Sequence, residues 1–387
     1  MIKLTFKKDE LFKALDYCNS CIEKKHPMVI LTNILFSFKD KECTLSATNL
    51  EITVIAKVNL EETVNEGKIA VPARSIYDIC RLSRADIVTF NYDESNNILD
   101  VTTGKSEYKV PCSDPSDFPE ISDTTKEYKT INISKFISLY KKVQFSMGEY
   151  FSANKTYSGV LITKVKADDG TTSIDMVTTD IHRLSVLKLK NFNVDIDEFE
   201  NGIVIPGKNF AEITKIFAEC SDAQIAIDND RDEKIFIKKD NVTFISRLFK
   251  NEFPKYQSII SSYEVLNSKE SAVINRKELI EAIKRVVIVL NTEDKIWTSK
   301  YFFKENVLKL TANSNSGGNS VDEIVIEKGF STERSVAVNA KYFLDVINVI
   351  DDNNVNVIVE ESPNKAMTIK EEADDFFYIH MVMPLRV

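Results

Sequence analysis

Hydrophobic and polar residues alternate along the chain with two periods, which predict strands and helices in a recurring order. Segments such as KLTF from Lys3 place an apolar residue at every second position, as a half-buried strand does. Other segments carry apolar residues at helical spacing, as Phe136, Leu139, Tyr140 and Val143 do. Turn signals such as SGG and SPN separate the strands into hairpins. The pattern predicts helices over residues 7–25, 72–84, 134–146, 206–220, 275–290 and 339–350.

The strand–helix units repeat along the chain with a period of about 133 residues. Pro72, Pro206 and Asn339 occupy the same place in three such units, IAVPARSIYDICRL, IVIPGKNFAEITKIF and VAVNAKYFLDVINVI. Three unrelated domains would not place them one period apart. We therefore predict an α+β fold of three similar domains with antiparallel sheets. Their predicted limits are residues 1–126, 127–268 and 269–387.

Positive charge is concentrated on the predicted helices, although the 387-residue chain has a net charge of −9. The six predicted helices together carry +8, so the rest of the chain carries −17. Arg74 and Arg81 are seven residues apart, and so are Lys277 and Lys284. Seven residues are nearly two helical turns, so each pair is expected on one helix face, opposite the apolar face. Lys135 and Lys142 have the same spacing. A solvated face is the alternative interpretation of any one stripe.

Basic helices on a repeated scaffold favour contact with the phosphate backbone of nucleic acid, without regard to base sequence. An acidic exterior would repel nucleic acid everywhere else, which fits a protein that surrounds a duplex. Six helices, each about 10 Å across, leave a ring opening of about 9 Å, and twelve leave about 28 Å. Duplex DNA is roughly 20 Å wide. A ring of two chains is therefore predicted, and a ring of one chain is excluded.

Catalytic and metal-binding motifs are not found in the sequence. TTGKS at 102–106 resembles the end of a phosphate-binding loop, but Leu99 occupies the position of the required glycine. HExxH, GxSxG and the dinucleotide-binding glycine pattern do not occur. Cys18 and Cys21 form a CxxC without a second pair nearby, so reduced thiols are predicted rather than a zinc site. We predict a non-catalytic protein without cofactor or metal; a metal-dependent nuclease is the enzymatic alternative.

Eight short segments, in order along the whole chain, carry a resemblance to a known family. They are ILTNILFSFKDKECTLSATNLEITVIAKV, VPARSIYDICR, DFPEI, FSM, TTDIHRLSV, FPKYQSII, VNAKYFLDVI and VMPLRV. Each is weakly specific alone, but eight in one order are very specific. By these segments the chain resembles the bacterial DNA sliding clamps, the beta subunits of DNA polymerase III. A non-replicative interaction scaffold is the alternative function from a different class.

The resemblance implies a head-to-tail homodimeric ring with helices lining a central pore and antiparallel sheets outside. It implies a replication processivity factor that slides on duplex DNA and tethers the polymerase III catalytic subunit, the clamp loader and other clamp-binding proteins. Lys25 matches a DNA-contacting position of the family. With the residues of the predicted helices, the expected DNA-binding set is Lys25, Arg74, Arg81, Lys135, Lys141, Lys142, Lys208, Lys277 and Lys284.

The resemblance also implies a peptide-binding cleft between the second and third domains, completed by a C-terminal tail. Flexible Met, Leu, Ile and Pro side chains accept varied apolar anchors, and His182 and Arg183 are expected to hold a peptide's polar end. A satisfied turn histidine is the alternative for His182. Ile181 departs from the family, which usually has Gly there. The expected cleft residues are Tyr157, Thr179, His182, Arg183, Leu184, Pro254, Ile259, Asn339, Tyr342, Met381, Met383, Pro384, Leu385 and Arg386.

The sequence also bears on where the protein works. No run of residues approaches the roughly 18 consecutive apolar residues that cross a bilayer. The first residues, MIKLTFKKDELF, have no apolar segment behind their charges. A cytoplasmic protein without membrane contact is therefore expected.

Overall fold

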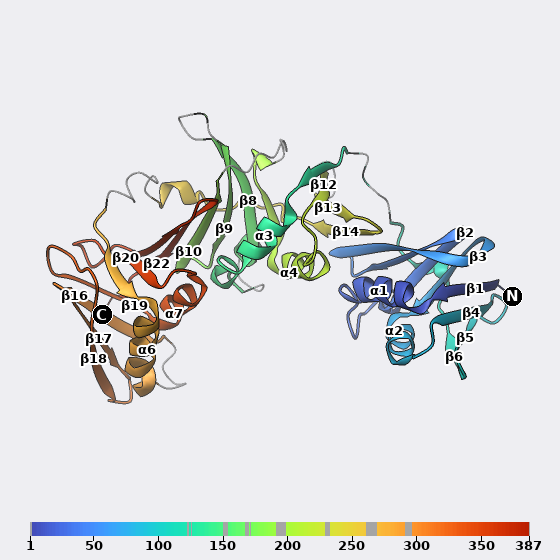
Figure 1. The fold of residues 1–387 in the computed structure, drawn as a ribbon, viewed down its shortest axis with the longest axis horizontal. Helices are drawn as coiled ribbons and strands as arrows, with labels where there is room; N and C mark the ends of the chain where they lie inside the picture. The colour runs from blue at the N-terminus through green and yellow to red at the C-terminus, as the bar shows by residue number, and fades with distance from the viewer. Residues whose placement is uncertain are drawn as a thin grey trace. The chain divides into compact units, whose positions relative to one another are not determined.

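The chain folds into two compact units, each built of antiparallel sheets and short helices (Figure 1). The structure is a computed structural model that describes residues 2–121, 124, 126–149, 154–166, 170, 172–190, 199–228, 233–260, 269–290 and 296–386. Unit 1 comprises Met1–Ile137 and Lys208–Leu248, and unit 2 comprises Ser138–Gly207 and Phe249–Val387. The predicted boundary at residue 268 lies outside the described residues.

The described strands of unit 1 form two sheets. The four-stranded sheet has the order β1 (Ile2–Lys7), β4 (Ile87–Asp93), β5 (Ile98–Thr103), β6 (Ser106–Pro111). The six-stranded sheet has the order β2 (Asn33–Thr48), β3 (Ile52–Pro72), β14 (Val242–Arg247), β13 (Lys234–Lys239), β12 (Ala223–Asp228), β7 (Lys129–Ile131). Helices α1 (Lys8–Asn19) and α2 (Ala73–Leu82) pack against each other. Strand β3, from the first sequence repeat, pairs with β14, from the second.

The core of unit 1 follows the alternation seen in the sequence. Leu4 and Phe6 of β1 are buried, and the intervening Thr5 is less so. The ring of Phe6 lies edge-on to Phe36 and Phe90, with centroids 6.4 and 5.1 Å away. Large aromatic side chains that pack in this way stabilise a core beyond the area they bury.

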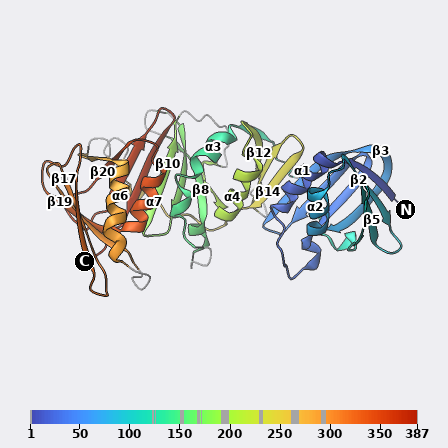
Figure 2. The same cartoon turned by 60° about the horizontal axis from the view of Figure 1, so that its bottom comes forward.

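In unit 2, too, the strands that the structure describes form two sheets. Its eight-stranded sheet has the order β11 (Ile203–Pro206), β8 (Gly159–Lys166), β9 (Thr172–Thr179), β10 (Arg183–Leu189), β22 (Phe376–Val382), β21 (Met367–Glu372), β20 (Asn354–Ile358), β15 (Ala272–Asn275). The four-stranded sheet has the order β18 (Asn319–Val325), β17 (Val307–Asn313), β16 (Thr298–Lys304), β19 (Arg334–Asn339). Helices α6 (Arg276–Val286) and α7 (Ala340–Val349) lie side by side (Figure 2).

Polar side chains begin two of the helices where the repeat predicts. The Asn275 side chain accepts hydrogen bonds from the backbone N–H groups of Lys277 and Glu278, at the start of α6. The Asn339 side chain accepts one from Lys341 at the start of α7. Such caps satisfy N–H groups that the first helical turn leaves unpaired.

The helices are shorter than the hydrophobic pattern predicts. Helix α1 ends at Asn19 rather than at residue 25, and α3 (Ile133–Tyr140) ends six residues before the predicted 146. The backbone N–H groups of Lys142 and Val143 bond three residues back, to Leu139 and Tyr140, so the chain leaves the α-helix there. Helix α4 (Gly207–Ile216) also stops short of residue 220. Lys25, Lys141 and Lys142 therefore lie outside helices, contrary to the prediction.

Candidate functional site

A small apolar pocket lies in unit 2, where the turn between β9 and β10 meets the end of β22. Its volume is about 150 Å³, comparable to a cavity that holds a benzene ring. Below it, Leu184 and Tyr256 belong to a buried apolar cluster, against which Phe253 and Met381 pack. The pocket is lined by Tyr157, Thr179, Ile181, Arg183, Leu184, Phe253, Pro254, Tyr256, Ile259, Met381 and Met383.

The register of the sheet brings the pocket's two chain segments together. Strand β10 pairs with β22 so that Leu184 lies opposite Met381. The chain continues past β22, where the backbone N–H of Met383 donates a 2.8 Å hydrogen bond to the carbonyl oxygen of His182. Residues about 200 positions apart in sequence thus form one wall.

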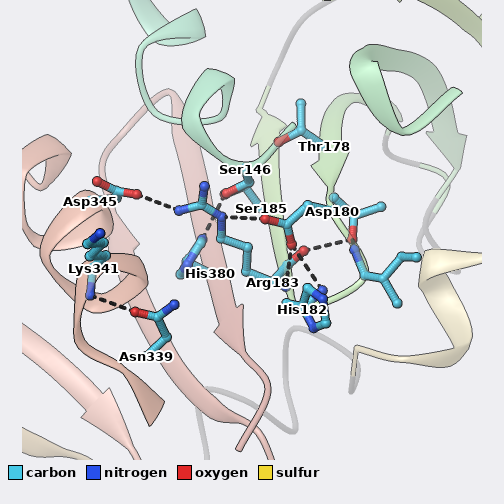
Figure 3. A network of polar contacts seen from close by, with 12 residues as sticks. Ser146, Thr178, Asp180, His182, Arg183, Ser185, Asn339, Lys341, Asp345 and His380 are labelled. Atoms are coloured by element: carbon cyan, nitrogen blue, oxygen red, sulfur yellow. Dashed lines mark hydrogen bonds and ion pairs between the residues drawn. The ribbon is translucent and has the colours of Figure 1, made fainter. Parts of the chain in front are cut away.

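The turn from Thr179 to Arg183 is held by its own polar groups (Figure 3). The Asp180 side chain accepts hydrogen bonds from the backbone N–H groups of His182 and Arg183, at 3.0 and 2.9 Å. The Thr179 hydroxyl accepts one from Ile181 at 3.1 Å and donates one to the Arg183 carbonyl at 2.7 Å. Aspartate and threonine commonly close turns in this manner.

Arg183 is a structural cation of the pocket wall. Its guanidinium donates to Asp180 Oδ2 at 2.9 Å and to Asp345 Oδ2 of α7 at 2.5 Å (Figure 3). It also lies 4.2 Å from the ring centroid of Tyr342, as cation–π pairs do. Two of its five N–H donors are thus used within the protein, and these two bonds position the turn against α7. The expectation that Arg183 holds a peptide's polar end stays a prediction.

Behind the turn lies a buried polar cluster. The Ser185 hydroxyl is 2.7 Å from that of Ser146 and 2.8 Å from Nδ1 of His380 (Figure 3). Burial, with a smaller contribution from the positive charge of Arg183, lowers the pKa of His380 to about 3. His380 is therefore neutral at physiological pH and belongs to the core of the site rather than to its surface.

The structure brings eight of the fourteen expected cleft residues into this pocket. They are Tyr157, Thr179, Arg183, Leu184, Pro254, Ile259, Met381 and Met383. The pocket also includes three residues that the expected set omits, Ile181, Phe253 and Tyr256. Phe253 and Tyr256 belong to the quoted FPKYQSII segment, whose apolar residues are the signal that finds them.

The other six expected cleft residues do not line the pocket. Asn339 caps α7, and Tyr342 contacts Arg183. The backbone N–H of His182 donates within the turn, and Pro384 follows the pocket wall formed by Met383. Leu385 and Arg386 line a different hollow beside β19, where the Leu385 N–H donates to the Ala337 carbonyl at 2.8 Å. The part that these six residues play in peptide binding stays a prediction from the resemblance.

Lys142 is buried, contrary to its predicted place in the DNA-binding set. Its side chain has no exposed surface, and its ammonium donates to Glu371 at 2.6 Å and to the Val349 carbonyl at 2.8 Å. A second carboxylate, of Asp351, lies 3.0 Å away. A lysine enclosed in this way cannot reach a phosphate. The seven-residue spacing from Lys135 failed because α3 ends before Lys142.

Most other basic residues of the expected set are exposed. Arg74 and Arg81 both lie on the surface of α2, with Asp78 between them and 2.9 Å from the Arg81 guanidinium. Lys277 and Lys284 are exposed on α6. Lys25, Lys141 and Lys208 are also exposed, Lys141 beside Asp351 at 3.2 Å, whereas Lys135 is half-buried. Exposed cations of this kind are available to phosphate groups.

Two further observations concern metals and membranes. Within the described ranges, no group of three or more His, Cys, Asp or Glu side chains could hold a metal ion. Cys18 and Cys21 are buried, and burial raises the pKa of the Cys21 thiol to about 12, which disfavours the thiolate that metals bind. Among the helices that the structure describes, none has the length and apolar character to cross a membrane.

The antiparallel repeat fold is that of the DNA-clamp class, as the comparisons with known families show. Three family models of the DNA polymerase III beta subunit match the chain, the N-terminal domain at residues 2–122, the central domain at 130–255 and the C-terminal domain at 266–386. The chain belongs to the DNA polymerase III beta subunit family. It is therefore built of three clamp domains, as the repeat predicts.

Curated relatives and solved structures agree over the full length. The chain is 26% identical to the Beta sliding clamp of Pseudomonas aeruginosa over 385 residues, 99% of each chain. It is 27% identical to that of Vibrio cholerae over 392 residues, 100% of each. Crystal structures of sliding clamps from Pseudomonas aeruginosa and Bacillus subtilis superpose with TM-scores of 0.87 and 0.85 at 24% and 22% identity. The first covers 100% of both chains, and the second covers 100% of this chain and 99% of the other.

Family membership confirms the predicted function. The chain is a non-catalytic processivity subunit that binds DNA, forms homodimers and tethers DNA polymerase III. The alternatives of a non-replicative scaffold and a metal-dependent nuclease are thereby set aside.

Proposed function

We propose that the pocket of unit 2 receives an apolar side chain from a peptide segment of the polymerase III catalytic subunit, and that other clamp partners compete for it. The observation that carries this proposal is the pocket itself, a hollow of about 150 Å³ with mostly apolar walls. Concave apolar sites with a few fixed polar groups are the usual form of a ligand pocket.

The composition of the pocket suits several partners. Met381 and Met383 have flexible thioether side chains that adapt to anchors of different shape. The turn from Thr179 to Arg183 is rigidly bonded on the other side. The flexible methionine wall can adapt to related peptides, while the rigid turn keeps them in one binding register.

The proposed DNA contacts are made by exposed cations of the helices and adjacent loops, without Lys142. Lysine and arginine attract phosphate regardless of base sequence, so the clamp can move along a duplex. Lys135 is retained as a weaker candidate because its side chain is half-buried. The retained set is Lys25, Arg74, Arg81, Lys135, Lys141, Lys208, Lys277 and Lys284.

The domain limits and the cellular location also belong to this proposal. The domain limits at residues 1–126, 127–268 and 269–387 follow the sequence repeat and are supported by the similar limits of the three family matches. A cytoplasmic location is proposed because the DNA that the family binds lies there in bacteria. Fractionation of cells together with their chromosomal DNA would test that location.

The peptide proposal is tested by a charge placed in the pocket. Met383 is 45% exposed, so Met383→Asp should fold normally and weaken a labelled polymerase-derived peptide at least about tenfold, because a carboxylate would have to lose its water. Fluorescence anisotropy measures the affinity. Met28 is equally exposed, at 46%, and does not line the pocket. Met28→Asp is therefore the matched control, and equal affinities in both variants would refute the proposal.

A further inference from the structure

Ile181 adopts a backbone conformation that suits its residue type poorly. Its φ angle is +78°, in the left-handed region where a β-branched side chain is strained. Its side chain is 64% exposed, so burial in the core does not offset this strain. The same side chain lines the pocket of unit 2.

The backbone of the turn is held by its neighbours rather than by Ile181. Five hydrogen bonds close the segment from Thr179 to Arg183, and none of them uses the isoleucine side chain. A conformation fixed by surrounding bonds can retain an unfavourable residue, and such residues cluster at functional sites. The turn would therefore keep its shape with a different side chain at position 181.

An equivalent turn one repeat earlier provides an internal comparison. In unit 1, the Thr48 hydroxyl accepts a hydrogen bond from the Leu50 N–H at 3.1 Å and donates one to the Ile52 carbonyl at 2.9 Å. The Asn49 side chain accepts from Glu51 and Ile52, as Asp180 accepts from His182 and Arg183. Leu50 has a φ of +73° and occupies the place of Ile181.

The two turns differ in what surrounds them. Leu50 is 44% exposed and does not line the pocket of unit 2, whereas Ile181 does. Strain alone is therefore not the mark of a function, because both turns have it. The distinguishing feature is a stiff aliphatic side chain in the wall of a hollow that admits one mid-sized group.

We propose that Ile181 determines which anchor side chain the pocket accepts. Its branched side chain contacts the anchor of the bound peptide and limits the width of the pocket, so that a leucine-sized anchor is preferred to a tryptophan. This inference rests on the proposed peptide-binding function. Removing the side chain would lose contact area with a small anchor and make room for a large one.

The test uses two labelled versions of one peptide from the polymerase III catalytic subunit of the same organism, with Leu or Trp as the anchor. In Ile181→Gly we expect the Leu peptide to bind about tenfold more weakly, and the preference for Leu over Trp to shrink by a similar factor. Ile181→Asn should behave likewise, because asparagine also tolerates the left-handed region. The thermal midpoints of both variants should equal or exceed that of the unchanged protein.

Leu50→Gly is the matched control, because it makes the same change in the equivalent turn. It should leave both peptide affinities unchanged. Unchanged affinities and preference in Ile181→Gly, with normal binding by the unchanged protein, would overturn the inference alone. If neither peptide binds the unchanged protein, the peptide-binding proposal fails and this inference fails with it.

Discussion

At the scale of single residues, two adjacent lysines show how differently one residue type is used. Lys141 is exposed beside Asp351, whereas Lys142 is enclosed by Glu371, the Val349 carbonyl and the ring of Phe376, whose centroid is 5.0 Å away. A buried charge is tolerated only when it is paired and fully hydrogen-bonded.

Replacing Lys142 should therefore strongly destabilise the fold. In Lys142→Met the carboxylate of Glu371 stays buried without its cation, which is expected to cost about 3–5 kcal/mol. Lys141→Met should cost about 1 kcal/mol or less, because its ion pair is exposed. Urea denaturation measures both values. Similar losses in the two variants would contradict the buried pairing.

His380 should make stability depend on pH. Burial lowers its pKa from 6.5 to about 3, so between those values the unfolded chain binds a proton that the folded chain does not. Stability from this residue is complete above pH 6.5 and falls as the pH decreases toward 3. Between pH 7 and pH 5 the loss is about 2 kcal/mol.

The measurement compares urea denaturation of the unchanged protein and His380→Gln at both pH values. The variant should lose less stability on acidification. The comparison has to be between the two proteins, because burial raises the pKa of Asp175 and gives that residue the opposite pH dependence. An identical loss in both proteins would show that His380 titrates normally.

At the scale of elements, β22 and the segment after it have separate roles. Strand β22 pairs with β10 on one side and β21 on the other, so it belongs to the sheet whether or not the tail is present. Met383 lines the pocket, but Leu385 and Arg386 lie against a hollow beside β19.

Two truncations separate these roles. Deleting residues 383–387 removes a pocket wall and should weaken peptide binding by about tenfold or more. Deleting residues 385–387 leaves the pocket lining intact, so the affinity should change less than about threefold. Fluorescence anisotropy measures both, and circular dichroism checks the fold. An equal loss in both deletions would place the binding determinant in Leu385 or Arg386.

At the scale of the whole molecule, the repeat in the sequence and the compact units of the structure do not coincide. The second repeat is divided, because β14 pairs with β3 of the first repeat and β10 pairs with β22 of the third. Each pairing covers a strand edge that would otherwise be open to other chains. Three similar domains are therefore joined by continuous sheets rather than by linkers alone.

A sliding clamp should be held on DNA by topology. After loading, the dimer should stay on nicked circular DNA and leave the same DNA once it is cut, since a ring escapes only over a free end. Gel filtration with labelled protein measures the retained fraction. Equal retention on circular and cut DNA would contradict encirclement.

Reversing two exposed charges of α6 should weaken DNA binding. Lys277→Glu with Lys284→Glu should lower the affinity for DNA about tenfold or more at moderate salt. Lys304→Glu with Lys309→Glu, on strands β16 and β17, is the matched control.

The local sequence pattern alone predicted the repeats and many of the helices and strands of this protein. The three repeats, the strand alternation and the starts of the helices at Asn275 and Asn339 follow from residues within a few positions of one another, because helices and strands form through short-range bonds and side-chain spacing. The family segments likewise identified eight residues of the pocket.

Only the tertiary structure decided which of these residues act together. Lys142 has the sequence features of a surface lysine, yet its partner Glu371 is 229 positions away. Phe253 and Tyr256 join Met383 in one pocket through packing that no local spacing encodes. The burial of a charge and the walls of a pocket depend on contacts between distant segments, and sequence periodicity carries no information about such contacts.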